Sequence, residues 1–240
     1  FYHLLFWSFC VIHRLFPVVA SACLVFTAPG MAQNHTHEYE LDNGLELIVQ
    51  EDHRAPVAVV QVWYRVGSSY EHDGITGISH ALEHMMFKGT ETRTAEQVDL
   101  AFDNLGAEHN AFTSSEMTAF WGAGLPEVIG NIEEILADIL RPSLREVDFD
   151  DEKKVILEEI AMYDDQPFWV LYENAMEQYY GNSPLGHRVL GTKQTINEMN
   201  RDELAGYFEQ RYSADNTIIA IAGRVDFDNI VAQIELHCRQ

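Results

Sequence analysis

Apolar residues recur along the chain at two spacings, one typical of strands and the other of helices. Alternating or continuous apolar runs predict strands over 38–52 (a hairpin), 57–68, 107–124 (two strands) and 216–225. The hairpin turns at Asn43-Gly44, a pair that accepts the positive φ angles of tight turns.

Apolar residues three and four positions apart predict helices between and after these strands. They cover 77–88, 94–105, 126–140, 147–164, 167–180, 195–198, 201–212 and 227–238, while 182–192 predicts a loop. Gly106 ends the second helix and Pro126 begins the third. No internal repeat or linker divides 33–240. The expected fold class is α+β, a single domain with a mostly antiparallel sheet covered by helices on one side.

The first 32 residues differ in composition from the rest of the chain. Arg14 is the only Asp, Glu, Lys or Arg among them, and an apolar run and then small residues follow it. This order predicts a signal peptide over 1–32, cleaved after Ala32, and hence a periplasmic or secreted protein. A membrane anchor is the alternative, but two prolines and a serine interrupt the run, and a span needs about 20 apolar residues.

The 240-residue chain carries 15 Lys and Arg against 38 Asp and Glu, a formal net charge of -23. This balance argues against nucleic acid and anionic membrane surfaces and favours basic or unfolded peptides as partners, although a solvated acidic surface alone would explain it. Only Cys238 lies beyond the predicted signal peptide, so an internal disulfide and a cysteine-rich zinc site are both excluded. Any metal must therefore be bound by histidines and carboxylates.

The stretch GISHALEHMMFKGT, residues 77–90, places His80, Glu83 and His84 in an apolar helix. Positions i, i+3 and i+4 share a helix face, so both imidazoles can bind one ion. Catalytic zinc typically has three protein ligands and one water position, and Glu83 beside the metal can accept the proton of that water. The order His-x-x-Glu-His is the inverted form of a zinc-peptidase motif. An ordinary helix with two histidines is the alternative, and the glutamate in the required position favours the metal site.

The helix over 147–164 offers several carboxylates as a third ligand. One face is charged throughout and carries Asp151, Lys154, Glu158 and Asp165. Another carries Glu152, Val155, Glu159 and Met162. A carboxylate buried beside Val and Met is costly unless it is paired or bound to metal. Glu159 is therefore the favoured ligand and Glu152 its supporting partner for a histidine N–H, while Glu158 is a lower-ranked rival.

The chain resembles the pitrilysin-type (inverzincin) zinc peptidases, the family of insulin-degrading enzyme and the mitochondrial processing peptidase. The matching stretches are HALEHMMFKGT (80–90), GAEHNAFTSSEMTAFW (106–121), EKKVILEEI (152–160), PLGHRVLGT (184–192) and IAGRVDFDNI (221–230). The resemblance implies one zinc ion held by His80, His84 and Glu159. It also implies that Glu83 is the general base and Glu152 a supporting carboxylate.

The same resemblance implies that HNAFT is a sheet edge on which the substrate lies as an added strand. Asn110, Ala111 and Phe112 are the candidate substrate-binding residues, because backbone hydrogen bonds bind an extended peptide whatever its side chains. An ordinary core strand with Phe112 packed inside is the alternative. The isolated histidines His72, His109 and His187 receive no role.

Members of this family normally combine two homologous halves around the peptide, and 33–240 corresponds to the N-terminal, zinc-binding half. A second homologous half or subunit is therefore an expected partner. The implied function is a zinc-dependent endopeptidase or oligopeptidase that hydrolyses extended peptides. The alternatives are a non-catalytic subunit that binds peptides or a catalytic partner, and a lyase of similar fold, S-ribosylhomocysteine lyase. The lyase needs a cysteine ligand, which Cys238 at the far end does not provide.

Overall fold

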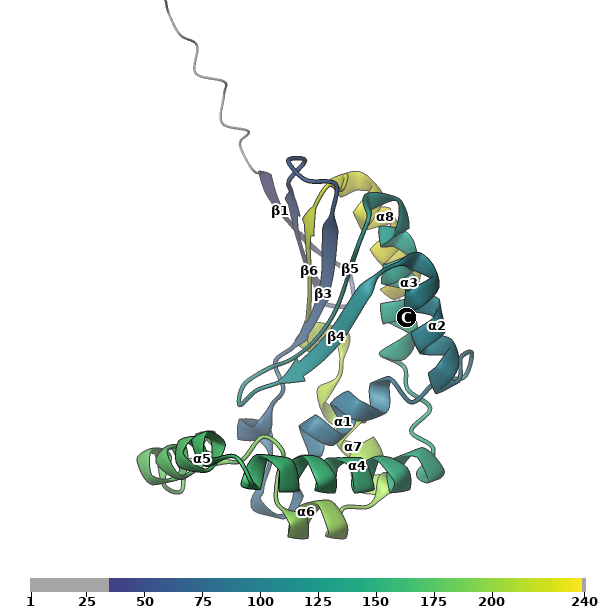
Figure 1. Cartoon of the computed structure of the whole chain (residues 1–240). Coiled ribbons are helices and arrows are strands. Elements are labelled where there is room, and N and C mark those ends of the chain that lie inside the picture. The colour runs from purple at the N-terminus through teal and green to yellow at the C-terminus, as the bar shows by residue number, and fades with distance from the viewer. Residues whose placement is uncertain (1–34, 239–240) are drawn as a thin grey trace, which may run out of the picture. The chain divides into compact units, whose positions relative to one another are not determined.

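Six strands form one sheet in the computed structural model, which describes residues 35–238 (Figure 1). The predicted signal peptide, 1–32, lies outside the described residues. The strands are β1 His35–Glu40, β2 Glu46–Glu51, β3 Ala58–Tyr64, β4 Glu108–Thr113, β5 Thr118–Gly124 and β6 Thr217–Gly223. They lie in the order β1-β2-β6-β3-β5-β4, and every pair is antiparallel except β2 with β6. The prediction of a mostly antiparallel sheet is confirmed.

The helices form two groups around this sheet (Figure 1). They are α1 Ile78–Met86, α2 Ala95–Leu105, α3 Ile129–Ile139, α4 Glu146–Asp164, α5 Pro167–Tyr180, α6 Lys193–Glu198, α7 Arg201–Arg211 and α8 Phe227–Cys238. Helices α2, α3 and α8 lie beside the sheet, whereas α1, α4, α6 and α7 gather near one end of it and α5 projects outward. Within the described part of the chain, no helix is both long and apolar enough to cross a membrane.

The core lies between one face of the sheet and the helices. Along β3, every second residue from Ala58 to Tyr64 is buried, and the residues between them are only partly covered. Gly122 of β5 pairs with Val60 on the buried face, and a Cβ added there would lie 2.5 Å from Cγ2 of Ile132 on α3. The glycine thus permits close helix–sheet packing, and the prediction that helices cover one side of the sheet is confirmed.

Local sequence signals set both ends of α2. Thr94 and Gln97 form a reciprocal capping box at the start of α2. Gly106, with a φ of +63°, ends that helix in the left-handed conformation that glycine adopts readily. The helices begin and end close to the predicted residues, but α1 is slightly shorter than 77–88 and α6 is two residues longer than predicted. Helix α3 begins at Ile129 and not at the predicted Pro126, because residues 126–128 form a 3₁₀ turn.

Candidate metal centre

Helix α1 is held at its N-terminus by a buried carboxylate. The backbone N–H groups of Gly77 and Ser79 donate to Glu71 at 2.8 and 2.9 Å, so a carboxyl group lies at the positive end of the helix dipole. Gly77 has a φ of +95°, which favours glycine. The buried apolar side chains of α1 are Ile78, Ala81, Leu82, Met85 and Met86. Together these contacts position the motif residues of α1 against α4 and β4.

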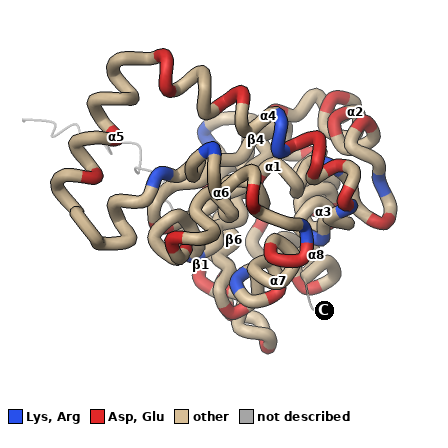
Figure 2. The backbone as a smooth tube through the Cα atoms, turned by 90° about the horizontal axis from the view of Figure 1, so that it is seen from below, with Lys and Arg blue, Asp and Glu red and all other residues tan. Residues whose placement is uncertain are grey.

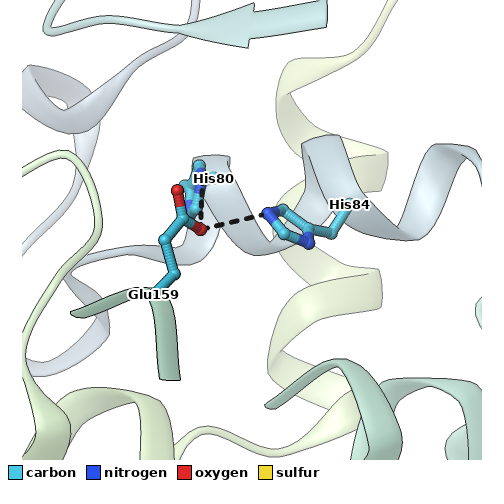
Figure 3. A group of neighbouring side chains, drawn as sticks. All are labelled: His80, His84 and Glu159. Carbon is cyan, nitrogen blue, oxygen red and sulfur yellow. Dashed lines mark ion pairs between the residues drawn. The ribbon is translucent and has the colours of Figure 1, made fainter. Parts of the chain in front are cut away.

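The structure brings the three predicted ligands together. Oε2 of Glu159 lies 3.6 Å from Nε2 of His80 and 3.5 Å from Nε2 of His84 (Figure 3). The three ligand atoms all lie within 4.8 Å of one another. Tetrahedral zinc, with ligands about 2.0–2.2 Å away, separates its ligand atoms by about 3.3–3.6 Å. The nitrogen and oxygen donors therefore fit a zinc ion, and the two nitrogen–oxygen distances match the spacing of its ligands.

Glu83, the remaining residue of the His-x-x-Glu-His motif, points toward the edge strand β4 and does not join this cluster. Oγ1 of Thr113, the last residue of β4, donates to Oε2 of Glu83 at 2.5 Å. Burial raises the pKa of the Glu83 carboxyl, and the hydrogen bond from Thr113 opposes this rise. Glu83 is thus a fixed, partly desolvated carboxylate beside the ligands, which suits a group that takes up and releases a proton.

Glu152 contacts His84 as predicted for a supporting carboxylate. Its Oε2 lies 3.0 Å from Nδ1 of His84, which leaves Nε2 of the ring facing Glu159. Burial raises the pKa of Glu152, but hydrogen bonds from His84 and Lys88 outweigh it and lower the pKa overall. Burial would lower the pKa of His84, yet hydrogen bonds to Glu152 and Glu159 raise it to about 9. Burial lowers the pKa of His80 to about 4.

The predicted apolar neighbours of Glu152 and Glu159 on α4 are wrong. Val155 and Met162, expected on a buried stripe with these glutamates, are 46% and 52% exposed. The buried residues of α4 are Phe149, Glu152, Ile156 and Ile160. Glu159 lies at the border of that stripe, half-covered, where it can reach the ligand cluster. The rival Glu158 is exposed.

The predicted substrate-binding residues lie on a free sheet edge. β4 pairs with β5 alone among the described strands. Phe112 is 41% exposed and contacts the ring of Trp63 edge-on, so the alternative of a core position for Phe112 is wrong. Asn110 is exposed and its side chain accepts the N–H of Ala111. Phe112 on this unpaired edge directly precedes Thr113, the residue that donates to Glu83. The edge is therefore a suitable place for an extended peptide.

The other histidines stay outside the metal cluster. His109 stacks on the ring of Phe102 with centroids 4.0 Å apart. His187 bonds through Nδ1 to the carbonyl oxygen of Ser68 and lies 3.4 Å from Asp73. Both side chains are thus held by local contacts away from the candidate ligands.

Comparison with known proteins identifies the family. Residues 46–193, more than half of the chain, match the family described as insulinase, peptidase family M16. The chain belongs to peptidase family M16. The uncharacterised zinc protease YmxG of Bacillus subtilis is 35% identical over 198 residues, 82% of this chain and 48% of that protein. The mitochondrial-processing peptidase subunit beta of Neurospora crassa is 36% identical over 209 residues, 84% of this chain and 44% of that protein.

Solved structures of M16 proteins share this fold. A protease from Helicobacter pylori superposes with a TM-score of 0.83 at 25% identity, covering 86% of this chain and 50% of that one. A peptidase M16 inactive domain from Pseudomonas fluorescens has a TM-score of 0.79 at 17% identity, which shows likeness of fold alone. This chain therefore spans about half the length of the M16 relatives and structures it matches.

Two residues of this M16 site were not predicted from sequence. Thr113, which donates to Glu83, and Lys88, which contacts Glu152, lie 30 and 64 positions from their partners. Lys88 belongs to the motif stretch itself, but nothing in a sequence pattern indicates which carboxylate a lysine will meet. The long strand-to-helix contact of Thr113 likewise depends on how β4 packs against α1.

Proposed function

We propose that this M16 chain is the zinc-binding, catalytic half of an endopeptidase or oligopeptidase that hydrolyses extended peptides. The observation that carries the proposal is the convergence of His80, His84 and Glu159 beside Glu83, whose carboxylate is held by the free sheet edge. The named zinc proteases among the relatives support the choice of metal.

The residues divide the chemistry between them. His80, His84 and Glu159 would hold one zinc ion, which when bound polarises the scissile carbonyl and acidifies a water. Thr113 fixes Oε2 of Glu83, and the carboxylate would accept the proton of the attacking water. As the water oxygen bonds to the carbonyl carbon and the C–N bond breaks, Glu83 would return the proton to the leaving amine. Glu152 keeps a proton on Nδ1 of His84, so that Nε2 is the ligand atom.

A peptide would lie along the edge of β4 at Asn110, Ala111 and Phe112. Backbone pairing would give affinity, and cavities beside the strand would give specificity. A cavity of about 300 Å³ opens at the end of β4, beside Thr113, and its walls include Tyr163, Trp169 and Tyr172. These aromatic walls favour an apolar side chain at that position of the substrate.

The charge distribution favours basic or unfolded peptides over acidic ones. Figure 2 shows Asp and Glu along α2, α4 and α5, with fewer Lys and Arg. A second cavity, of about 540 Å³, lies beside the first and is lined by the carboxylates of Asp73, Asp164, Glu173 and Glu177 and by the basic side chain of Arg188. Negative potential at a concave surface attracts cationic groups and raises their local concentration. Nucleic acid is not an expected partner.

The proposal includes a second half-domain or subunit, since the relatives are about twice as long as the region they share with this chain. It also places the protein in the periplasm or outside the cell, on the composition of residues 1–32. N-terminal sequencing of the protein purified from cell fractions tests both the compartment and cleavage after Ala32. An intact 1–32 segment in the membrane fraction would favour the anchor instead.

The test of function uses the full-length protein and its Glu83→Gln variant. The variant should retain stoichiometric zinc by mass spectrometry and lose peptide hydrolysis about 100-fold or more, as expected for removal of a general base. Glu158→Gln, an exposed change on α4, is the matched control and should retain both. A Glu83→Gln variant that cleaves at the normal rate would exclude Glu83 from the mechanism. Zinc binding without any hydrolysis by the wild type would favour the non-catalytic, peptide-binding subunit.

A further inference from the structure

A line of ionic contacts leads from the metal centre to Lys88. Its Nζ lies 2.7 Å from Oε1 of Glu152. The other oxygen of that carboxylate lies 3.0 Å from Nδ1 of His84, whose Nε2 lies 3.5 Å from Glu159. The two oxygens of Glu152 are thus divided, one for the lysine and one for the histidine. Lys88 is therefore two contacts away from His84 and three from the candidate metal position.

The two histidine ligands are not equally supported. Nδ1 of His84 has the carboxylate of Glu152 as its partner. Nδ1 of His80 is buried and has no hydrogen-bond partner among residues 35–238. A ligating histidine needs a partner on its outer nitrogen to fix the ring and its tautomer. Within the described part of the chain, this outer support therefore passes through Glu152 alone.

The Glu152 carboxylate needs a cation. Its side chain is only 7% exposed, and a buried carboxylate is costly unless it is paired. His84 is neutral when it acts as a metal ligand, so it contributes a hydrogen bond but no charge. Among the described residues, Lys88 supplies the only Lys or Arg nitrogen within salt-bridge distance of Glu152. The lysine accordingly stabilises the ionised carboxylate in the orientation that His84 uses.

The backbone around Lys88 is attached to the start of the helix that carries Glu152. The carbonyl oxygen of Gly89 accepts hydrogen bonds from the N–H and the hydroxyl of Ser143, each at 3.1 Å. The carbonyl oxygen of Lys88 accepts one from Nη2 of Arg145 at 3.2 Å. Ser143 and Arg145 directly precede α4. The backbone of Lys88 is thus fixed relative to the start of α4, which keeps its ammonium group within reach of Glu152.

We propose that Lys88 is a positioning residue of the metal centre, which holds Glu152 in place and thereby raises the affinity of His84 for zinc without touching the ion. The inference rests on the proposed function only for the identity of the metal. It does not require that the protein cleave peptides, so it can be tested by metal binding alone.

The first measurement is zinc affinity of the full-length protein, by competition with a chromogenic chelator. Loss of a partner one contact from a metal ligand typically costs 10–100-fold in affinity. Lys88 lies one contact further from the ligand, so Lys88→Met should weaken zinc binding about tenfold. Lys88→Arg, which keeps the cation, should have most of the wild-type affinity. Lys154→Met is the matched control, because Lys154 also lies near an acidic residue of α4 but pairs with exposed Asp151. It should bind zinc as the wild type does.

A double-mutant cycle tests the route through Glu152. Glu152→Gln should weaken zinc binding, and adding Lys88→Met to that variant should change it by less than twofold, because the lysine acts through the carboxylate. Thermal unfolding in excess chelator checks that each variant folds without metal. Should Lys88→Met fail to fold, Lys88→Gln, which keeps a donor but no charge, takes its place with the same expected loss.

Two outcomes would overturn the role of Lys88. One is an unchanged zinc affinity in Lys88→Met. The other is a loss of zinc affinity on Lys88→Met that is as large in the Glu152→Gln variant as in the wild type. A wild-type protein that does not bind zinc at all would instead refute the proposed function and this role with it. The readout therefore separates failure of the lysine from failure of the zinc site.

Discussion

Glutamine in place of Glu133 should remove the contribution of this residue to the pH dependence of stability in this domain. Glu133 lies on α3, is only 2% exposed, and neither of its carboxylate oxygens has a hydrogen-bond partner among the described residues. Burial raises the pKa of this carboxyl to about 8. The metal ligands do not contribute to this shift, so the effect is independent of the zinc site.

The magnitude follows from the shift. Glu133 ionises near its ordinary value of 4.5 in the unfolded chain and near 8 in the folded one. Between these values unfolding releases a proton, so stability falls as the pH rises and levels off above about 8. At about 1.36 kcal/mol per unit, the loss is at most about 5 kcal/mol. Glutamine cannot ionise, so Glu133→Gln should retain at pH 8.5 most of the stability it has at pH 5, apart from other titrating groups.

Urea unfolding of the full-length protein at pH 5 and pH 8.5 measures the effect. The free energy of unfolding should fall by several kcal/mol more in the wild type than in Glu133→Gln. Glu127→Gln, an exposed glutamate just before α3, is the control and should follow the wild type. Equal losses in the wild type and Glu133→Gln would refute the reasoning, since they would mean that Glu133 is ionised or paired in the folded protein.

Three further predictions concern the site. Zinc affinity should rise about tenfold per pH unit below 9, because zinc must displace a proton from His84, whose pKa is raised to about 9. Chelator competition at pH 6.5, 7.5 and 8.5 measures the zinc affinity, and an affinity that does not change with pH would contradict the prediction. Thr113→Val should lower kcat about 10–100-fold with little change in KM, because a hydrogen bond to the charged Glu83 is worth about 1.5–3 kcal/mol, and Thr113→Ser should restore the rate. Trp169→Ala should reduce kcat/KM for peptides with a large apolar residue at the position that meets the aromatic cavity. Peptides with alanine at that position should be cleaved as before. Equal losses of kcat/KM for both kinds of peptide would exclude the cavity as a specificity site.

Features that depend on neighbours in sequence were predictable. The His80, Glu83 and His84 arrangement follows from helical spacing alone, and the turn at Gly44 and the boundaries of α2 follow from glycine conformation and a capping box. Each of these depends on contacts within one helical turn or one tight turn. A single sequence contains all the partners of such contacts.

Features that depend on distant partners were decided by the tertiary structure. The insertion of β6 between β2 and β3, parallel to one and antiparallel to the other, joins segments more than 150 residues apart. The choice of Glu159 over Glu158 depends on which face of α4 packs against α1, and the supposed apolar neighbours Val155 and Met162 proved to be exposed. Helical periodicity gives the order of the residues of α4 around the helix axis. Only packing decides how the helix is rotated about that axis, and hence which residues face α1. The same long-range packing brings Thr113 to Glu83 and Lys88 to Glu152, and so completes a candidate metal centre whose ligands the sequence predicts.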